Sequence, residues 1–294
     1  MRLPVLFSAL AAVIIFGASP VAAKIAVSGM AAMDVALLRT VIGGLFILPI
    51  ALLMGIRLPQ TGGQKWLLLL SGFCGFVGFP VLFTLGIQLT SANHASMILA
   101  ALPILTGAIA MTWDNHKPNL KWITGCLVAL AGESVLIFGI QAWGSSMAQA
   151  SSVSGDLLVL CSNLFAALGY VAGGRLQRSG YPARGTTFWG VSIFAVVLVP
   201  LLPFVIDVQQ LGEAGIAPWL GLLYLAIGVT IIGYMLWYWA LGSGGIARVG
   251  LLQFLQPLSG VLLAWLLLGE LLSAGFFGAS VIILAGIALA ISGK

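Results

Sequence analysis

The chain contains 294 residues, of which 61% are hydrophobic and only 6% are charged. Soluble domains average roughly half apolar and about a quarter charged residues, so this composition excludes a soluble protein and indicates an integral membrane protein. The formal net charge of +5 comes from basic residues that lie between apolar stretches. It therefore reflects how the loops are placed about a membrane, and no nucleic-acid partner is expected.

The charged residues leave apolar runs of about 20 residues, enough to cross about 30 Å of hydrocarbon at 1.5 Å per residue. Membrane β-strands are shorter and alternate strictly, so the runs are predicted to be helices. The expected fold is an all-α integral membrane protein with ten transmembrane helices. Their ranges are Leu3–Ala23, Met33–Gly55, Lys65–Ile87, His94–Thr112, Lys121–Ile140, Gly155–Gly174, Thr186–Ile206, Gly215–Ala240, Arg248–Leu268 and Leu272–Ile291.

The first run also resembles a secretory signal, because Arg2 precedes an apolar core that ends in small residues near Ala23. The run is longer than a typical signal core, and the internal repeat described next requires this helix, so we expect it to be retained. With a cytoplasmic N-terminus, the basic residues of the loops and chain ends fall on the cytoplasmic side, and only Lys24 falls on the opposite side. The positive-inside rule then predicts that both termini are cytoplasmic.

The sequence carries an internal repeat. "SANHASMILAALPIL" from Ser91 aligns with "GGIARVGLLQFLQPL" from Gly244 and matches Pro103 to Pro257, and both halves continue into a helix that contains "LAG". The chain is therefore predicted to consist of two five-helix units, residues 1–145 and 146–294. An odd number of helices in each unit inverts the second relative to the first, which is the architecture by which many secondary transporters alternate access.

Three stretches resemble the EamA-type repeats of the drug/metabolite transporter superfamily. They are "RTVIGGLFILP", "TSANHASMILAALPILTGAIA" and the long segment that contains "LLQFLQPLSGVLLAWLLLGELLSAGFFGASVIILAGIAL". The first half departs from the pattern, since "WDNHKP" from Trp113 stands where the second half has "LGE". The length and aromatic content are most similar to the bacterial aromatic amino-acid exporters. The resemblance implies an exporter of the bacterial inner membrane, with no cofactor.

Pro257 removes a backbone donor at membrane depth, where an unsatisfied polar group is costly, so polar side chains are expected around it. Gln253 and Gln256 lie three residues apart and project to one side of the helix. They could bond neighbouring helices, but we expect them to face an aqueous cavity and to contact substrate. Glu270 is expected to have a structural role in the turn that follows.

Other polar and aromatic side chains at membrane depth are further candidates for substrate contacts. Asn163 and Tyr170 lie seven residues apart on one helix face, whereas His94 opens a helix and could equally be a solvated helix end. The aromatic residues could form either core packing or the wall of a cavity. The candidate substrate-binding residues are Phe79, Phe83, His94, Met97, Asn163, Tyr170, Tyr234, Trp237, Tyr238, Gln253 and Gln256.

Two charges, Arg39 and Glu133, lie roughly 10 Å deep in their predicted helices at 1.5 Å per residue. Their equal depth and opposite sign predict a buried ion pair. The alternative is that Glu133 is a proton-coupling carboxylate, as intramembrane acids often are.

The sequence contains no HExxH, GxSxG or Walker lysine motif, so neither an enzyme nor an ATP-driven pump is expected. The predicted cavity of amides, hydroxyls, aromatic rings and Met suits small zwitterionic, amphipathic solutes. We therefore expect a monomeric transporter, surrounded by lipid, for aromatic and other large neutral amino acids such as methionine, and for threonine. The alternatives are an exporter of drugs or other metabolites, and a membrane receptor that moves nothing.

Overall fold

The computed structural model describes residues 2–90, 95, 98–142, 152–260, 262 and 274–292, with the side chains of 136–142 and 274–276 excepted. The helices of the first half are α1 (Leu3–Gly17), α2 (Ser19–Val27), α3 (Ala32–Leu53), α4 (Gly62–Phe73), η1 (Cys74–Gly78), α5 (Phe79–Leu89), α7 (Leu102–Trp113) and α8 (Leu120–Ala142). Those of the second half are α9 (Val153–Arg178), α10 (Ala183–Leu198), η2 (Val199–Leu201), α11 (Leu202–Val205), α12 (Val208–Glu213), α13 (Ile216–Leu223), η3 (Tyr224–Gly233), α14 (Tyr234–Gly244), α15 (Ile246–Gly250), η4 (Leu251–Leu255) and α17 (Ala274–Ser292).

The all-helical prediction is confirmed for the described residues, which contain no strand. Six helical segments are long and apolar enough to cross a membrane: Leu3–Val27, Ala32–Leu53, Gly62–Leu89, Val153–Arg178, Ala183–Val205 and Ile216–Gly244. Each overlaps one of the expected helices. The count of ten and the inversion of the second half remain predictions, because parts of the fourth and ninth expected helices lie outside the described residues.

The chain contains breaks that the apolar pattern did not predict. α1 ends at Gly17 and α2 begins at Ser19. The helix is broken there because Pro20 cannot donate the backbone hydrogen bond that the carbonyl of Phe16 would otherwise accept. The hydroxyl of Ser19 donates to that carbonyl instead, at 2.7 Å. A short helix, α12, follows the seventh expected span. The Asp207 side chain caps its N-terminus by accepting a hydrogen bond from the backbone N–H of Gln210.

Two of the helical segments are π-helices, in which each N–H bonds to the carbonyl five residues before it. η1 lies within the third expected span of the first half, and the longer η3 lies within the third expected span of the second half. π-helices are rare and are frequently found at functional sites. Their matched positions therefore direct attention to the place where these two spans meet.

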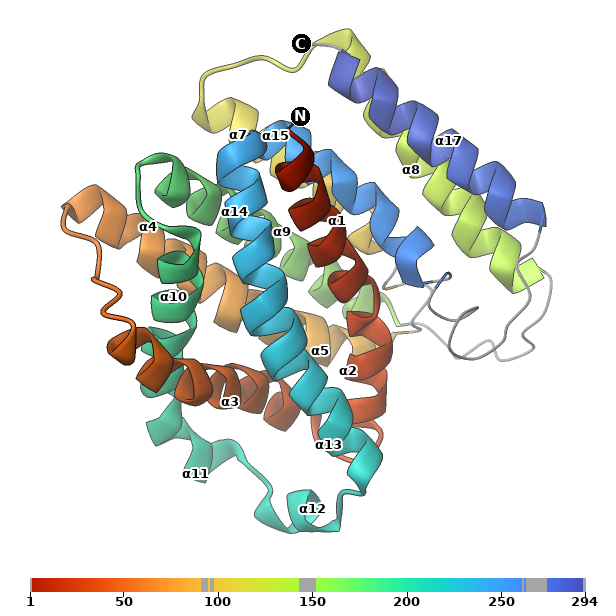
Figure 1. Cartoon of the computed structure of the whole chain (residues 1–294). Helices are drawn as coiled ribbons and strands as arrows, with labels where there is room; N and C mark the ends of the chain where they lie inside the picture. Colours follow the sequence, from red (N-terminus) through yellow and green to blue (C-terminus); the bar gives the residue numbers. More distant parts are fainter. Residues whose placement is uncertain are drawn as a thin grey trace.

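α8 and α17 lie side by side at the edge of the bundle (Figure 1). Small residues bring their backbones together, since a Cβ atom added to Gly125 would lie 2.6 Å from the carbonyl oxygen of Gly286, and one added to Gly286 would lie 2.4 Å from the backbone nitrogen of Ala129. Such close approach of small residues is the usual means by which helices associate in a membrane, where burial of apolar side chains gives little advantage.

Several basic residues lie at one end of the bundle, which we call the basic end. The Tyr181 hydroxyl donates there to the Arg57 carbonyl at 2.9 Å, and Asp114 forms ion pairs with Arg175 and Arg178. The start of α1 and the end of α17 lie toward this basic end, whereas α11 and α12 lie at the opposite end (Figure 1). Arg57, Arg175 and Arg178 thus lie at one end of the bundle, where the predicted arrangement of loops puts them. Which end faces the cytoplasm remains a prediction.

Candidate functional site

Six aromatic residues from four elements meet inside the bundle, and we call them the aromatic cluster: Phe16 from α1, Phe76 from η1, Tyr170 from α9, and Tyr234, Trp237 and Tyr238 from α14. Tyr234 lies centrally in the cluster, with ring centroids 4.8 Å from Phe76, 5.6 Å from Phe16 and 5.8 Å from Tyr170. All six side chains are buried. The sequence predicted the Tyr and Trp members but not Phe16 or Phe76.

The positions of Tyr234, Trp237 and Tyr238 follow from helix geometry, because residues three and four apart lie on one helix face. Tyr170 extends this surface across to α9, with its ring 5.7 Å from Trp237. The result is an aromatic wall between the two halves of the chain, able to cover a flat or apolar side chain.

The π-helix η1 is bonded to its neighbours through backbone carbonyls. The hydroxyl of Tyr234 donates to the Gly75 carbonyl at 3.0 Å, and the hydroxyl of Thr40 donates to the Phe76 carbonyl. These two donors come from α14 and α3. The irregular part of the third span is thus fixed by side chains of both halves.

The predicted Arg39–Glu133 pair is wrong. Arg39 is 2% exposed, and its Nε and Nη2 atoms donate to the hydroxyl oxygen of Thr230 in η3 at 3.4 and 3.3 Å. Its guanidinium lies within electrostatic range of the hydroxyls of Tyr170 and Tyr234. Equal depth was a poor guide, because α3 packs against α10 and η3 whereas α8 packs mainly against α17.

Glu133 is 1% exposed, and neither carboxylate oxygen has a hydrogen-bond partner among the described residues. It lies on the same face of α8 as two other buried residues, Cys126 and Ala129. A buried, ionised carboxylate without a partner is unfavourable. This position is therefore consistent with the alternative that the sequence left open, in which the carboxyl group binds and releases a proton.

Both matched prolines follow an interruption in their helix. α7 begins at Leu102, one residue before Pro103, and an α-helix resumes at Gln256, one residue before Pro257, after the 3₁₀ segment η4. The backbone is irregular just before each proline, in keeping with the missing proline N–H. The carbonyl of Gln253, four residues before Pro257, accepts from the backbone N–H of Gln256.

The first helix of each half contacts the interrupted helix of the other half. Asn163 in α9 donates to the carbonyl of Ile98, upstream of Pro103. In the second interrupted helix, the Gln256 side-chain amide donates to the Phe16 carbonyl of α1 at 3.3 Å, and Ser259 donates to that of Val13 at 3.3 Å. The contact made by Asn163 and the contact made by Gln256 and Ser259 therefore join corresponding pairs of helices in the predicted internal repeat. Gln256 therefore bonds a neighbouring helix, which is one of the two roles considered for it.

Several buried polar atoms in α9, α14 and η4 have no hydrogen-bond partner of normal geometry in the described part of the chain. They are both side-chain amide atoms of Gln253, Oδ1 of Asn163, Nε1 of Trp237 and the hydroxyl of Tyr238. Gln253 is 3% exposed and lies beside Tyr170. Buried polar groups are normally paired, so this group of donors and acceptors is chemically able to bind a polar ligand.

The remaining predicted residues are distributed as follows. Phe79 and Phe83 stack on each other with centroids 5.3 Å apart, and no ring contact joins them to the aromatic cluster among the described residues. His94, Met97 and Glu270 lie outside the described residues. No sequence pattern pointed to Thr230, although the Phe16 carbonyl, which loses its backbone donor at Pro20, could have indicated Phe16.

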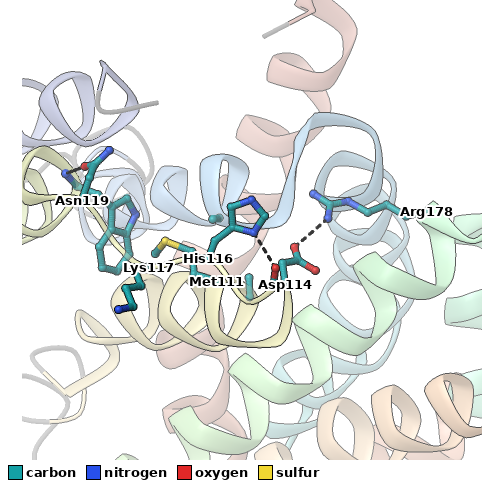
Figure 2. A pocket seen from close by; sticks show the side chains of 9 residues that line it. Met111, Asp114, His116, Lys117, Asn119 and Arg178 are labelled. Carbon is teal, nitrogen blue, oxygen red and sulfur yellow. Dashed lines mark hydrogen bonds and ion pairs between the residues drawn. The ribbon is translucent and has the colours of Figure 1, made fainter.

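A cavity with a volume of about 430 Å³ lies at the basic end. It is lined by polar side chains that include Asp114, His116, Lys117, Asn119 and Arg178. Figure 2 shows the Arg178 guanidinium directed toward the Asp114 carboxylate, 3.5 Å away. Arg175 pairs with the same carboxylate and lies 5.1 Å from the ring of Trp113. The "WDNHKP" departure from the repeat thus supplies the acid that joins α7 to α9.

A bundle of long apolar helices, with a closed centre of aromatic and neutral polar side chains, defines a multi-pass membrane protein with a polar interior. The profile of the EamA-like transporter family matches residues 3–138 and 153–292, and the chain belongs to this family. It is therefore a membrane transporter of the drug/metabolite transporter superfamily.

Its relatives by sequence include bacterial transporters. The chain is 33% identical to the uncharacterized transporter YdeK of Bacillus subtilis over 88% of this chain and 86% of that protein. It is 30% identical to the probable amino-acid metabolite efflux pump of Salmonella typhimurium over 83% of this chain and 78% of that protein. A crystal structure that is 20% identical in sequence has the same fold, with a TM-score of 0.76 over 99% of this chain and 97% of its own.

Proposed function

We propose that this transporter exports amino acids, chiefly aromatic and other large neutral ones such as methionine, together with threonine and related small amphipathic metabolites. The relatives described as amino-acid efflux pumps or exporters support this substrate class, including a probable terminal-alkyne amino-acid exporter of Streptantibioticus cattleyicolor that is 23% identical over 74% of this chain and 69% of that protein. The export direction rests on the same relatives.

The observation that carries the proposal is the group of unpartnered polar atoms beside the aromatic cluster. An amino acid has a charged, hydrogen-bonding end and a side chain, and the centre of the bundle offers both kinds of surface next to each other. Gln253 supplies an amide within reach of the Tyr170 hydroxyl whose atoms make no hydrogen bond of normal geometry among the described residues, and Asn163 supplies a carbonyl oxygen of the same kind. Tyr170, Tyr234 and Trp237 supply the surface for an aromatic or large apolar side chain.

We also propose alternating access between two inverted five-helix units, residues 1–145 and 146–294, with both termini on the cytoplasmic side of a bacterial inner membrane. The counterpart contacts of Asn163 and Gln256, and the π-helices in the third span of each half, support this repeat. Reporter fusions at Gln149 and Arg178 test the topology, because the two sites should lie on opposite sides of the membrane. Finding both reporters on one side would contradict it.

The transport test uses purified protein in lipid vesicles. Vesicles loaded with unlabelled phenylalanine should accumulate labelled phenylalanine against its own gradient, whereas empty vesicles and vesicles without protein should not. Methionine and threonine should compete. A drug exporter would show counterflow with cationic drugs instead, and a receptor would bind phenylalanine without any counterflow.

A further inference from the structure

A cation without an acidic partner lies in the closed centre of the bundle. The guanidinium of Arg39 is 2% exposed, and its recorded hydrogen bonds go to one neutral acceptor, the hydroxyl oxygen of Thr230. No carboxylate among the described residues forms an ion pair with it. Arginine stays protonated in proteins, so the positive charge cannot be avoided by loss of a proton.

Such an arrangement is unfavourable unless something compensates for it. A charge at membrane depth costs several kcal/mol, and buried charges are normally paired. The two bonds to Thr230 are long and go to an oxygen that itself donates to the Leu225 carbonyl at 2.8 Å. Two of the three guanidinium nitrogens thus share a single neutral oxygen.

The surroundings of Arg39 are those of the candidate site. Thr230, which accepts from the guanidinium, lies one helical turn before Tyr234, and the guanidinium is within electrostatic range of the hydroxyls of Tyr170 and Tyr234, two members of the aromatic cluster. Gln253 is buried within reach of the Tyr170 hydroxyl. The same small region thus contains a lone cation, free neutral donors and acceptors, and an aromatic surface.

We propose that Arg39 is the anchor for the carboxylate of the substrate, an assignment that rests on the proposed amino-acid transport. The planar guanidinium can bind a carboxylate through two parallel hydrogen bonds. One unpaired cation balances one negative charge, so the geometry favours a monoanionic carboxylate over a doubly charged phosphate. Gln253 then bonds the polar atoms beside the carboxylate, and the aromatic cluster covers the side chain.

Three probes separate the contributions of the two ends of phenylalanine: L-phenylalanine itself, 3-phenylpropanoate, which lacks the amino group, and phenethylamine, which lacks the carboxylate. The shift of unfolding temperature as a function of probe concentration gives an apparent affinity for each. In the unaltered protein, 3-phenylpropanoate should bind about 10 to 100 times more tightly than phenethylamine, the usual range for a charge-assisted, bidentate pair.

The variants test whether residue 39 produces that preference. Arg39→Gln should abolish the preference for the carboxylate probe, and Arg39→Lys should keep part of it, since the charge remains without the planar fork. Thr230→Val removes the recorded partner of Arg39 but keeps the cation, so the preference should remain. Arg184→Gln makes the same chemical change at an exposed position, and the ratio of affinities should not move.

The outcomes are distinct. If phenylalanine neither binds to the unaltered protein nor shows counterflow, the amino-acid function itself fails. If phenylalanine binds but the unaltered protein has equal affinity for 3-phenylpropanoate and phenethylamine, the carboxylate anchor is refuted while transport stands. The same conclusion follows if Arg39→Gln still binds 3-phenylpropanoate more tightly than phenethylamine. Should Arg39→Gln fail to fold, Arg39→Lys decides, because an unchanged affinity ratio in that variant would equally refute the anchor.

Discussion

The phenol of Tyr234 in the second half donates to the backbone carbonyl of Gly75 in the first half, at 3.0 Å. Gly75 lies in the π-helix η1, and Tyr234 directly follows the π-helix η3. The hydrogen bond therefore joins the irregular segments of the two counterpart spans, at the place where the aromatic cluster is formed.

Tyr234→Phe removes this bond and keeps the ring. It should lower stability by about 1–3 kcal/mol, because a buried carbonyl loses its side-chain donor, and it should also reduce transport. Tyr224→Phe is the control, since its hydroxyl also donates to a backbone carbonyl, that of Ile15 at 2.8 Å, and Tyr224 is half-buried and not a member of the aromatic cluster. Thermal unfolding in detergent and vesicle counterflow measure the two effects. Equal transport in the two variants would separate Tyr234 from the substrate pathway.

The two glutamines should respond differently to replacement by leucine. Gln256→Leu removes the bond to the Phe16 carbonyl and should lower both stability and transport. Gln253→Leu removes an amide that has no recorded partner, so transport should fall while stability is unchanged or rises, as is usual when an unsatisfied buried polar group is replaced. Loss of stability in Gln253→Leu with full transport would assign that amide to folding instead.

Glu133→Gln tests proton coupling. If the buried carboxyl carries a proton in this conformation, a neutral amide of the same shape should leave the unfolding temperature nearly unchanged, while proton-driven transport is lost. Glu213→Gln, at an exposed position in α12, should alter neither. The measurement is uptake into vesicles with and without an imposed pH gradient. A large loss of stability with unchanged coupling would show that Glu133 is a structural ion.

Asp114→Asn tests the contact between α7 and α9 at the basic end. The side chains of Asp114 and its two arginine partners are 29–38% exposed, so the loss of stability should be small, at most about 1 kcal/mol. The rate of counterflow should change more than the stability does, since the bonds join the two halves. High salt should produce a similar change in the unaltered protein and little in the variant. A salt effect of equal size in both would contradict this role.

Gly286→Ala should be costly although it adds one methyl group. That methyl would lie 2.4 Å from the backbone nitrogen of Ala129, so α8 and α17 would have to separate, at a cost of about 1–3 kcal/mol. The control is Gly278→Ala in the same helix, where an added Cβ meets nothing within 4 Å. The difference in unfolding temperature between the two variants isolates the helix contact. Equal stability would argue against close packing there.

The sequence predicted the helical class, the long apolar spans and the interruptions at Pro103 and Pro257, because hydropathy and proline chemistry act locally. It did not predict the two π-helices, since no local pattern distinguishes them from α-helix. The Arg39–Glu133 pair failed for a related reason: depth along a helix can be counted from sequence, but the direction in which a side chain points across the bundle depends on which helices become neighbours. Asn163 is buried, and its role in substrate binding stays a prediction; its partner, the Ile98 carbonyl, was visible only in the structure.

The pairing of α8 with α17 affects how the protein must be made. α17 is the last described helix of the chain, and about 130 residues separate it from α8, so at about 5–20 residues per second α8 is inserted on the order of ten seconds before its partner is synthesised. Throughout that interval the glycine face of α8 is covered by lipid or by a helper protein, and a ribosome that stalls before α17 releases a chain with that face exposed. Quality control that detects unassembled membrane helices would therefore find in α8 a signal that persists until α17 has been made.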